Sequence, residues 1–140
     1  MSDVRITVSE RRGRRSASSG SRWEPVFGYS RAVRTGNVIA VSGTVGIDAD
    51  GTYAPSITEQ TRRALEIIRA ALEALGGRLE HVIRTRMFVT DISRWEEVAA
   101  AHGTVFGEIR PATTLVEVAR LIDAEAQIEI EADAIVPPEA

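Results

Sequence analysis

Apolar residues recur along the chain with two different periods, and each period predicts a different secondary structure. Between Ser56 and Gly76 they return every three or four positions, which predicts a long amphipathic helix. Ser56 or Thr58 can cap its start, and Gly76-Gly77 is typical of its end. The predicted buried stripe comprises Ile57, Thr61, Ala64, Leu65, Ile68, Leu72 and Leu75.

The same spacing predicts a second helix from Ser93 onward. Ser93 is placed to act as its N-cap, and Glu96 three residues later completes a capping box. Gly107 and Pro111 are typical of its end. One stripe of this helix is predicted to hold Trp95, Val98, Ala99, His102 and Phe106.

Strands are predicted where β-branched and apolar residues are dense or alternate with polar ones. They are expected at 32–34, 38–43, 82–90, 112–118 and 126–135. The turn Thr35-Gly36-Asn37 joins the first two into a hairpin. The last strand alternates strictly, with alanine and isoleucine on one side and glutamine, glutamate and aspartate on the other.

The predicted order is strand, strand, helix, strand, helix, strand, strand. Two helices of this kind can cover one face of a single mixed or antiparallel sheet, so we expect an α+β sandwich. The other face would carry Arg84 and Arg86 beside the carboxylate row Glu129, Glu131 and Asp133. Such a face either meets solvent or turns toward other subunits with apolar side chains at the seams, and the pattern allows both.

The composition narrows the chemistry of the chain. Among 140 residues there is no cysteine, and all 17 basic residues are arginine. These absences exclude a cysteine nucleophile, a Cys-ligated metal and a lysine Schiff base. Two histidines are too few for a His-rich site, so no metal and no cofactor are expected. No long apolar run or signal-like start is present, so we expect no membrane segment and a cytoplasmic protein.

Charge is distributed unevenly between the two parts of the chain. Residues 1–34 hold eight arginines against three acids, a balance of +5, whereas residues 35–140 hold nine against 17, a balance of −8. The Arg/Ser-rich segment 1–20 is either a nucleic-acid arm or a solvated, partly flexible N-terminus. Because no aromatic interleaves its arginines and the remainder is acidic, we favour the second interpretation, with one domain at 21–140.

Short motifs lie in one order between Gly28 and Val136. They are Gly28-Tyr29-Ser30-Arg31-Ala32-Val33, Gly36-Asn37-Val38-Ile39-Ala40-Val41-Ser42-Gly43, Gln60, Arg110-Pro111-Ala112, Val116-Glu117-Val118-Ala119-Arg120-Leu121 and Ile128-Glu129-Ile130-Glu131-Ala132. Together they resemble the Rid family, also called YjgF or reactive intermediate deaminase and earlier labelled endoribonuclease L-PSP. The resemblance implies a chorismate-mutase-like fold and a homotrimer with a central barrel and clefts between subunits.

The resemblance also implies a chemistry. Family members with deaminase activity hydrolyse imines and enamines, and a glutamate matching Glu129 orients the water. A tyrosine matching Tyr29 and the strand end at Ser42-Gly43 line the cleft. The family places an arginine directly after Pro-Ala to clamp the substrate carboxylate, but here Thr113-Thr114 follows. A threonine hydroxyl cannot neutralise a carboxylate, so an archetypal 2-imino acid deaminase is not expected.

Other side chains have two possible roles. The family asparagine of the second helix falls on Ala99, and His102 either packs against the core or enters that space as an acid/base or hydrogen-bonding group. Trp23 either caps the cleft or covers an edge of the core, and we favour the second.

Two functions from different classes follow from these residues. The first is hydrolysis of an imine, an enamine or a related small molecule, with Glu129 and His102 as catalytic candidates and Tyr29, Ser42, Gly43, Thr113 and Thr114 as substrate-binding candidates. The second is non-catalytic binding of a small metabolite in the same cleft. RNA cleavage is less favoured because the domain is acidic.

Overall fold

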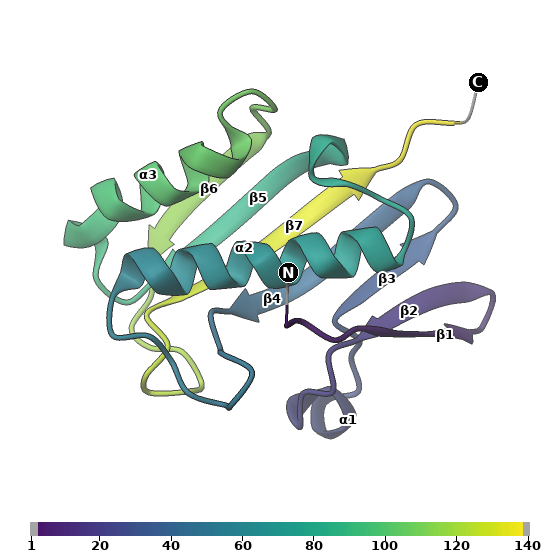
Figure 1. Ribbon diagram of the computed structural model, residues 1–140, viewed down its shortest axis with the longest axis horizontal. Helices are drawn as coiled ribbons and strands as arrows, with labels where there is room; N and C mark the ends of the chain where they lie inside the picture. The colour runs from purple at the N-terminus through teal and green to yellow at the C-terminus, as the bar shows by residue number, and fades with distance from the viewer. Residues whose placement is uncertain (1–2, 139–140) are drawn as a thin grey trace.

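The sheet of the computed structural model, which describes residues 3–138, has seven strands in the order β1-β2-β3-β4-β7-β5-β6 (Figure 1). Residues 1, 2, 139 and 140, at the outer ends of the predicted segments 1–20 and 21–140, lie outside this range. The strands are β1 (Thr7–Arg11), β2 (Arg14–Ser18), β3 (Ala32–Thr35), β4 (Val38–Val45), β5 (Val82–Val89), β6 (Ala112–Glu117) and β7 (Ile128–Ile135). Neighbouring strands are antiparallel except β5 and β6, which are parallel.

The first predicted helix is confirmed as α2 (Ile57–Ala74). The Ser56 side chain accepts from the backbone N–H of Glu59 and caps the start. Every residue of the predicted stripe is buried, from Ile57 to Leu75, against the sheet. Gly76 follows the C-cap at Leu75 with a φ of 82°, a conformation that glycine adopts without a steric penalty.

The second helix, α3 (Trp95–Phe106), begins differently from the prediction. Ser93 is not its N-cap, because a 3₁₀ turn, η2 (Ile92–Arg94), precedes it and Asp91 accepts hydrogen bonds from the backbone N–H and hydroxyl of Ser93. The predicted stripe is also wrong in part. Val98 and Phe106 are buried as expected, whereas Trp95 and Ala99 are exposed.

The last predicted strand is confirmed as β7, which lies between β4 and β5 in the sheet. Its apolar positions Ile128, Ile130, Ala132 and Ala134 are buried toward the helices, and the polar ones are half-buried on the other side. One sheet with two long helices on one face therefore confirms the predicted α+β sandwich. Two short 3₁₀ turns, η1 (Leu79–His81) and η2, precede β5 and α3.

Part of the predicted N-terminal segment 1–20 forms regular structure. Residues 7–18 form the β1–β2 hairpin, whose turn places Arg12 and Gly13 at φ values of 52° and 77°. Small residues of β2 fit against the core, with Ala17 fully buried. The Arg15 guanidinium donates to the carbonyl of Leu75 at the end of α2, which ties β2 to the fold, while every residue of β1 is exposed.

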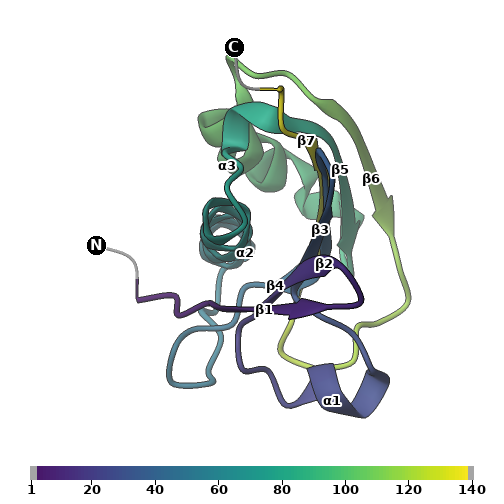
Figure 2. The same ribbon diagram turned by 90° about the vertical axis from the view of Figure 1, so that its right-hand side faces the viewer.

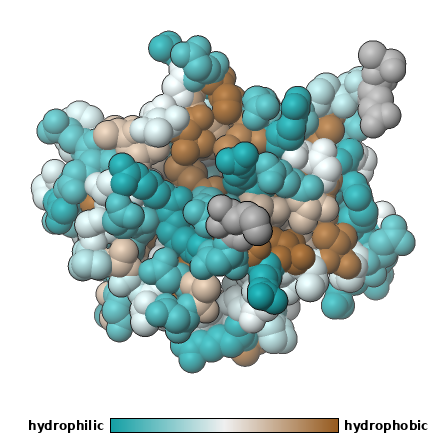
Figure 3. Space-filling view, viewed as in Figure 1, coloured by the Kyte–Doolittle hydropathy of each residue, from teal (hydrophilic) through white to brown (hydrophobic). Residues whose placement is uncertain are grey.

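The two faces of the sheet differ in cover. Figure 2 shows α2 and α3 on one side, while the short helix α1 (Trp23–Phe27), which was not predicted, lies at one end. Viewed from the helix side, the surface is largely hydrophilic, with hydrophobic residues gathered near α3 (Figure 3). On the open face, Arg86 lies 3.1 Å from Asp133 and 3.4 Å from Glu131, which places the predicted charged rows side by side.

None of the helices in residues 3–138 combines the length and the apolar character that crossing a membrane requires.

Candidate functional site

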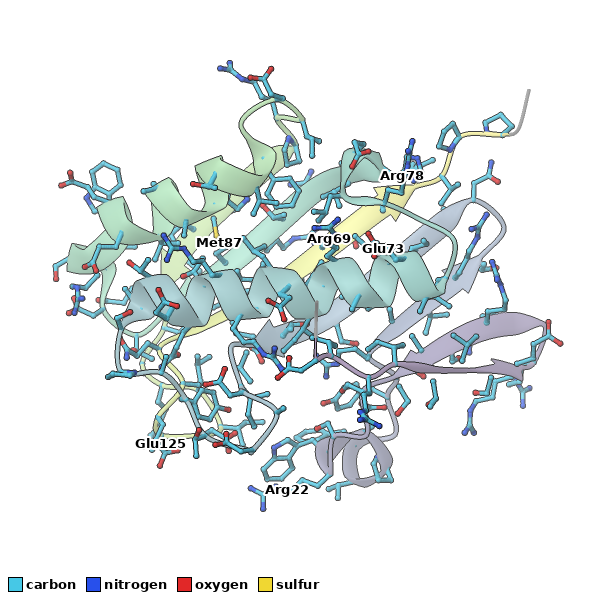
Figure 4. All side chains as sticks on the ribbon, in the orientation of Figure 1. Arg22, Arg69, Glu73, Arg78, Met87 and Glu125 are labelled. Carbon is cyan, nitrogen blue, oxygen red and sulfur yellow. The ribbon has the colours of Figure 1, made fainter. Side chains whose placement is uncertain are left out.

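An open pocket of about 1150 Å³ lies at the end of β4 and β7, between α1 and the loop before β7. Tyr29, Ser42, Gly43 and Glu129 line it, so the structure brings together four of the predicted site residues. Figure 4 shows the side chains of Arg22 and Glu125, which also line the pocket, at this end of the molecule.

Five residues form what we call the Arg31 cluster: Tyr29, Arg31, Gly43, Thr44 and Glu129. The Arg31 side chain is only 5% exposed, although it carries a charge. Its Nη1 donates to the carbonyl oxygen of Gly43 at 2.6 Å and to Oγ1 of Thr44 at 3.0 Å, and its Nη2 donates to the Tyr29 hydroxyl at 2.9 Å. Its Nε is buried without a hydrogen-bond partner.

Glu129 reaches the pocket because of an irregularity in the sheet. The pairing of β4 with β7 shifts register between Val41 and Thr44, which frees the backbone at Ser42-Gly43 from the regular ladder. A Cβ atom on Gly43 would lie 2.9 Å from Cδ of Glu129, so only a glycine leaves room for this carboxyl group. Burial raises the pKa of Glu129, Arg31 counteracts the rise, and Glu131 adds to it.

Ser42 lines the pocket with its side chain, and it also holds the neighbouring backbone in place through two hydrogen bonds. Its hydroxyl donates to the carbonyl of Ser30 at 2.6 Å, and its backbone N–H donates to the carbonyl of Arg31 at 2.9 Å. These two bonds join the loop before β3 to β4 at the point where the register shifts. The predicted lining role of Ser42 is therefore accompanied by a role in holding the Arg31 cluster together.

Aromatic side chains form one wall of the pocket. Trp23 packs edge-on against Phe27, and Phe27 against Tyr29, with ring centroids 6.2 and 6.1 Å apart. Trp23 is half-buried and lines the pocket, so its position is compatible with both of the roles considered for it. On the opposite side Tyr53 donates to Asp123 at 2.6 Å, and burial together with this carboxylate raises the pKa of Tyr53 well above its usual range.

His102 belongs to a separate hydrogen-bonded series beneath α3, which we call the Thr85 chain: Thr113, Thr85 and His102. Oγ1 of Thr85 lies 2.9 Å from Nε2 of His102 and 2.8 Å from Oγ1 of Thr113. Thr85 is fully buried, whereas Thr113 is exposed on the edge strand β6. Burial lowers the pKa of His102, which favours the neutral imidazole.

The structure does not bring the Thr85 chain to the pocket, since neither His102 nor Thr113 lines it. Thr114 lies apart from both, paired with Arg86 in the parallel register and directed to the opposite side of β6 from Thr113. The predicted residues thus occupy two separate regions of the molecule. Glu129 and Tyr29 lie at the pocket, and Thr113 and His102 lie at the sheet edge.

Arg31 is the main site residue that was not predicted from the sequence. It lies two positions after Tyr29 and directly before β3, and extended backbone places such residues on one side. That spacing could have linked it to the tyrosine. The Tyr53–Asp123 contact had no comparable signal, because its two residues are 70 positions apart in separate loops.

The chain is similar to known proteins in both sequence and structure. The model of the family described as Endoribonuclease L-PSP matches residues 19–136. The crystal structure of Rv2704 from Mycobacterium tuberculosis, a member of the YjgF/YER057c/UK114 family, is similar with a TM-score of 0.82 and 50% identity, over 88% of this chain and 99% of that one. A RutC family protein of Pyrococcus abyssi is 35% identical over 78% of this chain and 87% of its own. The 2-iminobutanoate/2-iminopropanoate deaminase of Salmonella typhimurium is 34% identical over 76% of this chain and 86% of its own.

Proposed function

The chain belongs to the Endoribonuclease L-PSP family, which includes the YjgF and Rid proteins, and we propose that it hydrolyses an imine, an enamine or a related reactive metabolite that lacks an amino-acid carboxylate. One observation carries the proposal: the neutral Thr113 stands directly after Pro111-Ala112, where the resemblance implies a carboxylate-clamping arginine. The deaminase name of the Salmonella relative supports the reaction class.

The charges of the pocket support a substrate without a carboxylate. Three of the four arginines that line it are engaged: Arg31 with its cluster, Arg22 near Asp123, and Arg63 with Asp3 and Glu66. Arg5, the fourth, is exposed. By contrast, among residues 3–138 neither Glu125 nor Glu129 has a cation within 4.0 Å. An anionic substrate would therefore meet carboxylates that no ion pair neutralises.

Glu129 supplies the base for hydrolysis. Water adds through its oxygen to the carbon of the C=N bond, and Glu129 accepts a proton from that water and returns it to the nitrogen, which gives a neutral carbinolamine. The hydroxyl of the carbinolamine then gives up its proton, the nitrogen gains one, and ammonia leaves as the C–N bond breaks and a C=O bond forms. Since imines hydrolyse readily once water and substrate are held together, positioning supplies most of the required catalysis. A carboxylate with a raised pKa is a stronger base for this task than an exposed one.

A homotrimer would complete the site. Thr113, Thr114 and His102 are away from the pocket of their own protomer, so they can contribute to substrate binding only at the cleft of a neighbouring copy. The open face of the sheet supports such an assembly, since it exposes Val38, Ile135 and Val116 around its charged centre. A mass measurement in solution tests this part, and a monomer would contradict it.

The experiment compares two imines that differ only in the carboxylate. A flavin-dependent amine oxidase acting on phenethylamine and an amino-acid oxidase acting on phenylalanine generate this pair, and semicarbazide traps whatever imine remains. We expect the protein to accelerate the loss of the carboxylate-free imine and to leave its partner almost unaffected. In Glu129→Gln the acceleration should fall by at least about 100-fold, the size of a general-base contribution.

Two other results would change the conclusion. Acceleration of neither imine, with binding of the parent amine retained, would favour the alternative of a non-catalytic metabolite-binding protein. A preference for the carboxylate-bearing imine would contradict the argument from Thr113. For nucleic acid, binding to RNA that weakens steeply with salt would be required before the endoribonuclease label applied to this chain.

Thr113→Arg is a second test. A bidentate guanidinium at this exposed edge position should raise kcat/KM for the carboxylate-bearing imine by about tenfold or more, since charged pairs of this kind contribute roughly 2–5 kcal/mol. Thr113→Gln is the matched control, because it adds a side chain of intermediate length without charge. An equal gain in both variants, or none in a correctly assembled Thr113→Arg protein, would contradict the account.

A further inference from the structure

Arg31 lines the pocket, and its surroundings differ from those expected of an arginine that only supports the fold. Its guanidinium is almost completely buried, yet no carboxylate lies within ion-pair distance of it among residues 3–138. Its partners are a backbone carbonyl, the Thr44 hydroxyl and the Tyr29 hydroxyl. Nε is left without a partner, so the group is oriented by these three contacts at the expense of one buried donor.

The contact with Tyr29 has only one possible direction. A guanidinium carries donors and no acceptor, so the Tyr29 oxygen must accept from Nη2. The tyrosine's own proton must then point elsewhere, and it meets no acceptor in the part of the chain that the structure describes. A hydroxyl that accepts from a cation is polarised and becomes a stronger donor.

Arg31 acts on Glu129 by a second route. Its Nη1 holds the carbonyl of Gly43, the residue over which the Glu129 side chain lies. Its positive charge also opposes the rise in the pKa of Glu129 that burial causes. Glu131, beside it on β7, adds to the rise, and Glu129 itself contributes to the raised pKa of Tyr53, which also lines the pocket.

We propose that Arg31 is the positioning residue of this pocket, which directs the Tyr29 proton toward a neutral acceptor on the substrate while holding Glu129 ionised beside the attacking water. The acceptor is the nitrogen of a C=N bond or the oxygen of a C=O bond. The inference rests on the proposed function, in which Glu129 activates water. In this arrangement the substrate is recognised by the donating Tyr29 hydroxyl and the accepting Glu129 carboxylate, and not by an arginine that binds a substrate carboxylate.

The first test does not depend on activity. The Glu129 carboxyl carbon is followed by NMR through a pH titration in the native protein and in Arg31→Gln. We expect a higher pKa of Glu129 in the variant, because the opposing charge is gone. Arg63→Gln is the control, since Arg63 lines the same pocket but is held by Asp3 and Glu66. An unchanged pKa of Glu129 in a folded Arg31→Gln protein would overturn the proposal.

The second test measures whether Arg31 acts through Tyr29. With the carboxylate-free imine, Tyr29→Phe and Arg31→Gln should each lower kcat/KM by about tenfold or more, the scale of one directed proton donor. The double variant should lose little beyond the larger single effect, because residues that work as a unit are not additive. Fully multiplicative losses would show that Arg31 and Tyr29 act separately.

The pH profile separates positioning from simple support of the fold. In Arg31→Gln the rise of kcat/KM with pH should move to higher pH, since Glu129 must ionise before it can accept a proton. A variant that was merely less stable would keep the native profile. If Arg31→Gln does not fold, Tyr29→Phe still decides, because its ring packing is retained: unchanged kcat/KM with an unchanged melting temperature would overturn the directed donor.

The outcomes distinguish the two proposals. If no imine is hydrolysed but the pKa of Glu129 shifts in Arg31→Gln, the proposed function fails and the electrostatic role of Arg31 remains. If hydrolysis is found and Glu129 titrates identically in both proteins, only the role of Arg31 is lost.

Discussion

The Arg31 cluster and the Thr85 chain are both hydrogen-bonded groups at the sheet, but they differ in how firmly their protons are directed. Arg31 can only donate, so every bond in its cluster has one orientation. Thr85 and Thr113 can each donate or accept, and a neutral His102 can do either at Nε2. The charged cluster therefore presents a fixed donor, while the neutral chain can reverse its direction to suit whatever contacts Thr113.

The same contrast explains how burial changes the pKa of Glu129 in the Arg31 cluster and that of His102 in the Thr85 chain. In the Arg31 cluster burial raises the pKa of Glu129, and the positive charge of Arg31 opposes part of that rise. In the Thr85 chain no charged group among residues 3–138 opposes the desolvation of His102, so burial favours the neutral imidazole. Three substitutions test the comparison, in order of decreasing expected effect.

Gly43→Ala should have the largest effect of the three, a loss of catalytic activity. The added Cβ would meet the Glu129 carboxyl, which can swing away because it ends a flexible side chain. Misplacing a catalytic group by about 1 Å costs roughly 100-fold in rate, so we expect a loss of that order with little change in melting temperature.

Gly103→Ala is the matched control, because nothing lies within 4 Å of the added atom on α3. It should preserve activity and raise stability by up to about 1 kcal/mol, the difference in helix propensity. Equal activities of the two alanine variants would show that the position of Glu129 over Gly43 is unimportant.

Thr85→Val should have an intermediate effect, a decrease in the free energy of unfolding. Valine keeps the shape but leaves Nε2 of His102 and Oγ1 of Thr113 without their shared partner. Leaving a buried polar group unsatisfied costs about 1–3 kcal/mol in the free energy of unfolding, measured by denaturant titration. In the control Thr104→Val, whose hydroxyl bonds to a carbonyl on the exposed side of α3, the change should remain within about 0.5 kcal/mol. A similar small change in Thr85→Val would contradict a buried chain.

His102→Gln should have the smallest effect, visible only as a pH dependence. Burial lowers the pKa of His102 from its ordinary 6.5, so its stabilising contribution is present above that value and is lost as pH falls through the lowered pKa. The free energy of unfolding should therefore decline less on acidification in His102→Gln than in the native protein. In the control His81→Gln, at a histidine outside the Thr85 chain, the native decline should be retained. Parallel pH curves for all three proteins would indicate that His102 titrates normally.

Much of the fold could be predicted because burial imposes a period on the sequence. Helix α2 and strand β7 each have one fully buried face, and their apolar residues mark it without interruption. The start of α3 was predicted wrongly because Ser93 and Asp91 are both good caps, and only the 3₁₀ turn decides between them. The β1–β2 hairpin escaped prediction because all residues of β1 are exposed, so no apolar period marks it.

The site was predictable only in part, for a different reason. Tyr29, Ser42, Gly43 and Glu129 were named from motifs, and the structure gathers them in one pocket. What gathers them is a register shift in β4, which strict alternation does not reveal. Arg31 was missed because a charged residue beside a strand is ordinarily expected to reach solvent. Its burial depends on partners that are contributed by β4, more than ten positions away.

The β1–β2 hairpin lies before residue 19, where the family match begins, and it covers the outer edge of β3. A chain shortened to the matched residues would leave the backbone of Ala32–Thr35 without its neighbour. An uncovered strand edge is a template for association with other sheets. The hairpin, with charged Glu10 and Arg11 on its own outer strand, thus protects the edge of β3 from association with other sheets. A shortened protein would lose solubility, and it would also lose Asp3 and Arg5 from the lining of the pocket.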